Sequence, residues 1–202
     1  MTMTPQDPCT WREPRIVPRK MWGAREPTGP IAPLKESPVP YFFLTWAAPV
    51  PHCYAPMECM MIVRELQQLH MDMGAPDIPY NFMIGDDGQV YEGRGWLNSC
   101  PVHPKFADRE GHALVFAYIG KKIWKKVPNE DTDPWMMDDF EDYKGAYEIM
   151  NYGVDNNYLD VERYLTGYRW EPEDWNTYGG KLKPLQLDEN ILNKPEDDYE
   201  PD

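Results

Sequence analysis

A short apolar run and a longer periodic pattern dominate the first half of the chain. Pro40 to Trp46 is apolar and aromatic, has the length of a strand and is bounded by prolines, which is typical of a strand buried on both faces. From Pro56 the apolar positions recur at steps of three and four residues, which predicts a helix that ends at Gly74. Its expected inward residues are Ile62, Leu66, Leu69 and Met73.

A β-hairpin is predicted next along the chain. Tyr80 to Ile84 and Gln89 to Tyr91 are apolar and aromatic runs, and Gly85-Asp86-Asp87-Gly88 lies between them. Glycine and aspartate supply the backbone conformations that a tight reversal needs. The two runs are therefore expected to pair as antiparallel strands.

A second helical pattern begins after Asp133-Pro134 and ends near Gly153. Strands and helices thus alternate, which predicts an α/β fold: a single domain with a central mixed β-sheet flanked by helices. The candidate inward residues of the second helix are Met137, Phe140, Ala146, Tyr147, Ile149 and Met150.

Charge and hydropathy restrict the function. The formal net charge of -14 argues against nucleic acid as a partner, because that binding depends on lysine and arginine. No apolar run reaches the length of about 18 residues that predicts a membrane span. Met1 to Trp11 has neither the basic start nor the apolar middle of a signal peptide, so we expect an intracellular protein, secreted only if this sequence is a processed or engineered form.

Several segments together resemble the peptidoglycan recognition proteins, relatives of the zinc-dependent type 2 N-acetylmuramoyl-alanine amidases. The hairpin carries the resemblance most clearly, and the other segments extend it over about residues 15–182. A single amidase-like domain is implied there, with an extension at 1–14 and an acidic, proline-containing tail at 183–202. The matching segments are Ile16 to Ala24, Val39 to Trp46, Cys53 to Cys59, Val63 to Met73, Tyr80 to Trp96, Ala113 to Gly120 and Tyr164 to Arg169.

The resemblance also shows where a catalytic zinc would lie. In amidases of this family two histidines and a cysteine hold the metal and leave a position for a bound water. The matching positions here are Thr45 (in the pair Thr45-Trp46), Tyr168 and about Asn176. Neutral oxygen donors bind Zn²⁺ poorly without histidine or thiolate. The sequence therefore predicts a degenerate amidase with no metal, no cofactor and no catalytic residues, in which Tyr80 is a vestige of the catalytic centre.

Muropeptide binding could survive this loss. By the resemblance, the candidate ligand contacts lie on the helix, the hairpin and the segment that follows, and the Gly95-Trp96 pair is similar to members that prefer diaminopimelate-type stems. These candidates are His70, Tyr80, Arg94, Gly95, Trp96 and His103.

The cysteines leave two alternatives open. Cys53 and Cys59 have the spacing of a disulfide that the resemblance implies, whereas an intracellular compartment would keep them reduced. In the second case they would serve as small buried apolar residues.

The sequence favours a binding role over hydrolysis. The main interpretation is a non-catalytic intracellular protein-interaction or structural subunit, whose partners are other proteins in a larger assembly. The 12 methionines and 8 tryptophans suit adaptable contact surfaces. The alternative is a receptor of innate immunity for diaminopimelate-type muropeptide, and residual amidase activity is the least favoured hypothesis.

Overall fold

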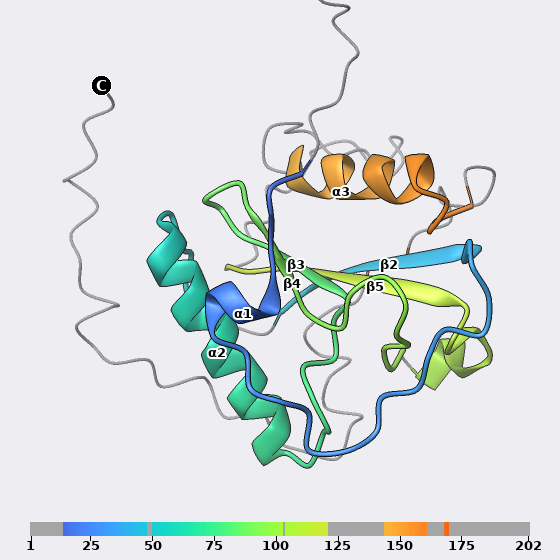
Figure 1. Cartoon of the computed structure of the whole chain (residues 1–202), viewed down its shortest axis with the longest axis horizontal. Coiled ribbons are helices and arrows are strands. Elements are labelled where there is room, and N and C mark those ends of the chain that lie inside the picture. Colours follow the sequence, from blue (N-terminus) through green and yellow to red (C-terminus); the bar gives the residue numbers. More distant parts are fainter. Residues whose placement is uncertain (1–13, 48–49, 103, 121–143, 161–167, 170–202) are drawn as a thin grey trace, which may run out of the picture.

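The computed structural model describes residues 14–47, 50–102, 104–120, 144–160 and 168–169, and the elements within them are drawn in Figure 1. The strands are β1 (Ile16–Val17), β2 (Tyr41–Trp46), β3 (Phe82–Ile84), β4 (Val90–Glu92), β5 (Ala113–Tyr118) and β6 (Tyr168–Arg169). The α-helices are α1 (Arg19–Trp22), α2 (Pro56–Asp72) and α3 (Lys144–Asp155), and Pro104–Arg109 forms a 3₁₀ helix.

The described strands form one mixed sheet in the order β1-β4-β3-β5-β2-β6. The predicted hairpin is β3 and β4, the antiparallel pair, and its reversal places Gly88 at a positive φ of 73°. The other neighbouring strands pair in parallel. The parallel strands β2, β5 and β3 end level with one another, because Tyr118 of β5 pairs with both Trp46 of β2 and Ile84 of β3.

Helices cover both faces of this sheet, with α3 on one side and α1 and α2 on the other (Figure 1). Successive residues of a strand point to opposite faces. Phe43 accordingly packs with residues of α2, whereas Phe42 and Leu44 pack with residues of α3. The predicted α/β class and the prediction that β2 is buried on both faces are therefore confirmed.

Helix α2 begins at Pro56, as predicted, and ends at Asp72. Ile62 and Leu66 are buried, but Leu69 is only half-buried and Met73 is exposed. The expectation for Met73 was wrong because the helix has already ended there. The buried residues of the helix are Cys59, Ile62, Val63, Leu66, Gln67 and His70.

Helix α3 is the second predicted helix, and its described part starts at Lys144. Ala146, Ile149 and Met150 are buried and Tyr147 is partly buried, as expected. The helix runs to Asp155, two residues beyond Gly153 and thus near the predicted end. A Cβ at Gly153 would lie 3.0 Å from side-chain atoms of Trp96 and Leu159; the glycine is needed for close approach and does not end the helix.

The candidate inward residues Met137 and Phe140 lie outside the described residues, as do the extension at 1–13 and almost all of the chain beyond 160. None of the helices formed by the described residues has the length and apolar character needed to cross a lipid bilayer.

A disulfide joins Cys53 and Cys59 at the start of α2. Of the two alternatives that the sequence left open, the structure contains the linked form, and both residues are fully buried. Cys100 is a free, buried thiol. The link fixes the loop between β2 and α2 to the first turns of the helix.

Replacing both Cys53 and Cys59 with alanine is expected to lower the free energy of unfolding by about 2 kcal/mol, because a short cross-link removes conformational freedom from the unfolded chain. Urea unfolding of the oxidised protein measures this change. Reducing agent should shift the wild type by a similar amount and leave the double variant unchanged. Equal unfolding midpoints for the oxidised wild type and the variant would contradict the prediction.

Candidate ligand-binding site

The first position that the resemblance assigns to a metal ligand, Thr45, lies near the carboxyl end of β2. Thr45 is fully buried and pairs with Ala117 of β5. On the other side of β2, Tyr168 of β6 pairs with Phe43, two residues before Thr45. The structure thus places two of the three positions that the resemblance assigns to metal ligands on neighbouring parallel strands. The third, Asn176, lies outside the described residues.

Metal-binding side chains do not gather elsewhere in the described part of the chain. Within it, no group of three or more histidine, cysteine, aspartate or glutamate residues is arranged to hold a metal ion. His112 is engaged with Glu36, its Nδ1 lying 2.5 Å from the carboxylate. Three or four such donors are the usual protein ligands of zinc.

Asn81 fixes the hairpin relative to the centre of the sheet. Its side chain donates hydrogen bonds to the carbonyl oxygens of Gly95 and Asn98, at 2.7 and 2.8 Å, and accepts one from the backbone N–H of Val115 at 2.7 Å. Asn81 is fully buried, so these bonds form away from water. One amide side chain therefore holds the segment after β4 against β5.

Arg94 is directed into the protein by a second set of hydrogen bonds. Its guanidinium donates to the carbonyl oxygens of Ile78 at 2.7 Å, Ser99 at 2.8 Å and Asp77 at 3.5 Å. A side chain that links three backbone carbonyls is held in one position. The structure therefore shows Arg94 as a support of the segment that was predicted to contact ligand.

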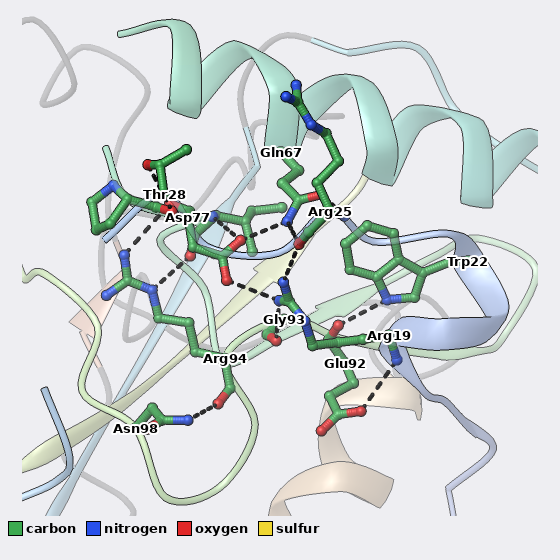
Figure 2. A network of polar contacts seen from close by, with 12 residues as sticks. Arg19, Trp22, Arg25, Thr28, Gln67, Asp77, Glu92, Gly93, Arg94 and Asn98 are labelled. Atoms are coloured by element: carbon green, nitrogen blue, oxygen red, sulfur yellow. Dashed lines mark hydrogen bonds and ion pairs between the residues drawn. The ribbon is translucent and has the colours of Figure 1, made fainter. Parts of the chain in front are cut away.

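The carboxylate of Asp77 connects this support to α1 and α2 (Figure 2). It forms an ion pair with Arg19 at 3.0 Å and accepts a hydrogen bond from the Gln67 amide at 2.7 Å. Asp77 is buried, and a buried carboxylate requires such partners. The guanidinium of Arg19 also donates to the carbonyl oxygen of Gly93 at 2.8 Å, which ties the hairpin to α1.

His70 and Tyr80 pack against each other in the interior. Their rings meet edge to face with centroids 5.6 Å apart, and both residues are buried. Nδ1 of His70 donates to the carbonyl oxygen of Leu66 at 2.7 Å. In these positions the two rings pack in the interior and can support a binding surface. A ligand could contact them directly only if the residues that bury them moved, so the predicted ligand contact stays a prediction.

Burial favours the neutral forms of His70, Tyr80 and Cys100. Desolvation lowers the pKa of His70 to about 4, with a smaller contribution from the positive charge of Arg94. Burial also raises the pKa of Tyr80 well above its usual value and that of the Cys100 thiol to about 12. A neutral thiol is a weak nucleophile. These three residues therefore present no acid, base or nucleophile that is active near neutrality.

Gly95 and Trp96 form the corner that was predicted to select the stem peptide. Gly95 has a positive φ of 70°, which suits a glycine. The Trp96 ring stacks on Tyr158 at 4.6 Å between centroids, contacts Phe82 at 4.4 Å and lies 5.8 Å from Tyr152 of α3. Trp96 is thus part of the packing beneath α3, and a ligand contact by its ring stays a prediction.

His103, the last predicted ligand contact, lies outside the described residues. Sequence reasoning missed the two organising residues, Asp77 and Asn81. A signal for Asn81 was present, because it is a polar residue between Tyr80 and Phe82 in a strand-like run. A buried amide in such a run must find several hydrogen-bond partners.

Known proteins similar in sequence to this chain are peptidoglycan recognition proteins. Peptidoglycan-recognition protein LB of Drosophila melanogaster is 31% identical over 170 residues, which are 83% of this chain and 66% of that protein. Peptidoglycan-recognition protein SC1a of the same species is 32% identical over 58% of this chain and 57% of its own length. The chain thus spans between about half and two thirds of the length of these relatives. No protein-family model matches the chain.

The solved structures that resemble this chain are also peptidoglycan recognition proteins. The crystal structure of Drosophila peptidoglycan recognition protein SD superimposes with a TM-score of 0.62 at 28% identity, over 78% of this chain and 83% of that one. Peptidoglycan recognition protein LE, solved in complex with tracheal cytotoxin, a monomeric diaminopimelic acid-type peptidoglycan, gives a TM-score of 0.61 at 25% identity, over 76% and 81%. The chain is thus a homologue of the peptidoglycan recognition proteins and has their amidase-like fold.

Replacing Asn81 with alanine is expected to lower the free energy of unfolding by about 3 kcal/mol, because it leaves several buried backbone groups without their partners. Denaturant unfolding measures the loss. Asn156→Ala is the matched control: this asparagine is exposed and donates one hydrogen bond, to the Tyr152 carbonyl oxygen. Its effect should stay within about 0.5 kcal/mol. Similar losses in the two variants would contradict the role of Asn81.

Acid should destabilise the fold through His70. Unfolded histidine takes up a proton near its ordinary pKa of 6.5, whereas folded His70 does so only near pH 4. Between these values the unfolded state binds more protons, so stability falls as the pH decreases from about 6.5 to 4, by about 3 kcal/mol in total. Unfolding of wild type and His70→Gln across this range should show the slope reduced in the variant. An unchanged slope in His70→Gln would refute the assignment.

Proposed function

We propose that the chain recognises diaminopimelate-type muropeptide and does not hydrolyse it. The observation that carries this proposal is the likeness to peptidoglycan recognition protein LE, whose solved complex holds a monomeric diaminopimelic acid-type peptidoglycan. The likeness covers 81% of that chain and 76% of this one. A shared fold of this extent supports ligand recognition by this chain.

The comparisons therefore favour the alternative drawn from the sequence over its main interpretation. The described residues and the similar proteins give no support to a structural subunit of a larger assembly. A receptor role agrees with the ligand bound in the structure of protein LE. An intracellular location stays a prediction.

The non-catalytic part of the proposal rests on residue chemistry at the metal positions. Thr45 and Tyr168 are neutral oxygen donors and lie on adjacent strands, at places where the resemblance calls for histidines. Zinc hydrolases use such ligands to generate a hydroxide from bound water near neutral pH. Without imidazole or thiolate at these positions, the water would have no metal to activate it.

The supporting network suits binding without catalysis. Recognition requires a fixed surface more than an active acid or base, because binding costs less when the protein is already ordered. Arg94, Asn81 and Asp77 order the backbone from residue 77 to residue 99 through buried hydrogen bonds. His70 and Tyr80 fill the interior behind it as neutral rings.

Calorimetric titration of the full chain with tracheal cytotoxin is expected to show saturable binding, weaker for the matching lysine-type muropeptide. Zinc analysis should find no stoichiometric metal, and chromatography of the titrated mixture should find no free stem peptide. A chelator should leave the affinity unchanged. Stoichiometric zinc together with released peptide would contradict the non-catalytic assignment, and an absence of binding to either muropeptide would contradict recognition.

A further inference from the structure

One aromatic side chain stands out on the surface beside the carboxyl ends of the central strands. Tyr54 lies in the loop between β2 and α2 and is 71% exposed. Exposed tyrosines that are held in place are typical of binding surfaces, because they offer a large apolar face at a low cost in conformational entropy. The neighbours of Tyr54 hold it in this way.

His52 supports the tyrosine from one side. The two rings are stacked at 5.8 Å between centroids and 12° between planes. Nδ1 of His52 lies 2.8 Å from the carboxylate of Asp86, in the reversal of the hairpin. The same carboxylate oxygen accepts a hydrogen bond from the backbone N–H of Cys53 at 3.3 Å, and Cys53 is linked to Cys59. The loop is therefore anchored both to the hairpin and to α2.

This group lies at the end of the sheet where ligands of open α/β folds bind. The row of Trp46, Tyr118 and Ile84 marks that end, and Asp86 and Gly120 follow Ile84 and Tyr118 by two residues. A Cβ on Gly120 would lie 2.9 Å from Nδ1 of His52 and 3.2 Å from Asp86. Glycine at this position lets the chain pass directly behind the pair.

We propose that Tyr54, His52 and Asp86 form a subsite for a sugar ring, and we assign it to the glycan part of the muropeptide. The inference rests on the proposed function. A pyranose presents one C–H face that packs on an aromatic ring, and hydroxyl groups at its edge that pair with polar side chains. When Nδ1–H donates to Asp86, Nε2 of His52 becomes an acceptor for a hydroxyl.

Charge favours a sugar over an anionic ligand at this place. The chain carries a formal net charge of -14, and Asp86 adds a carboxylate to the subsite itself. Acidic groups of a stem peptide would be repelled there, whereas N-acetylated sugar hydroxyls are neutral and can donate to the carboxylate. If Tyr54 instead packs against another protein, its replacement should not weaken binding of sugar-containing probes more than binding of the stem peptide.

The test compares three probes: tracheal cytotoxin, its stem peptide without sugars, and a trimer of N-acetylglucosamine. Tyr54→Ala is expected to weaken binding of the two sugar-containing probes about tenfold and to leave the stem peptide unchanged. Tyr54→Phe, which keeps the ring, should retain most of the affinity. Met57→Ala is the matched control, because Met57 is 64% exposed and is the second residue of α2. All variants should unfold at the wild-type temperature.

The outcomes separate this inference from the proposed function. Unchanged affinity for the sugar-containing probes in Tyr54→Ala, or an equal loss for sugar and stem peptide, would overturn the subsite. Wild-type binding of the sugar trimer through Tyr54 without any stem-peptide binding would uphold the subsite and overturn recognition of the stem. Wild-type protein that binds none of the three probes would overturn both.

Discussion

The buried carboxylate of Asp77 is the constraint on which the arrangement of this protein depends. It lies among three parts of the chain that are distant in sequence, and it meets Arg19 of α1 and Gln67 of α2 (Figure 2). An unpaired carboxylate at this depth would cost several kcal/mol. The N-terminal segment, the long helix and the approach to the hairpin therefore have to come together before the charge is satisfied.

Four residues further on, Asn81 extends the same constraint to the sheet. Its amide satisfies backbone groups on β5 and on the segment after β4, so the hairpin has one position relative to the central strands. Arg94, which belongs to that segment, donates hydrogen bonds to the carbonyl oxygens of Ile78 and Ser99 and so holds the segment against the residues before β3. The segments at the amino end of β3 are thus held in place by buried polar groups.

Much of the fold follows from local sequence. The apolar run at β2, the period of α2 and the glycine-rich reversal at Gly88 each encode their own conformation, and each forms as expected. The candidate site was less accessible to this reasoning. The ring of Trp96, a predicted ligand contact, packs between Phe82 and Tyr158 under α3. Which face an aromatic residue presents depends on a helix about fifty residues later, and no local pattern contains that information.

The sequence by itself determined the fold class and the resemblance to the peptidoglycan recognition proteins, because residue type and periodicity are local properties. Tertiary structure alone decided that Arg94 points at carbonyl groups, that His70 and Tyr80 are buried together and that Tyr54 stands against the His52–Asp86 pair. Burial and hydrogen-bond partners arise from contacts between distant segments. They become defined only when those segments pack.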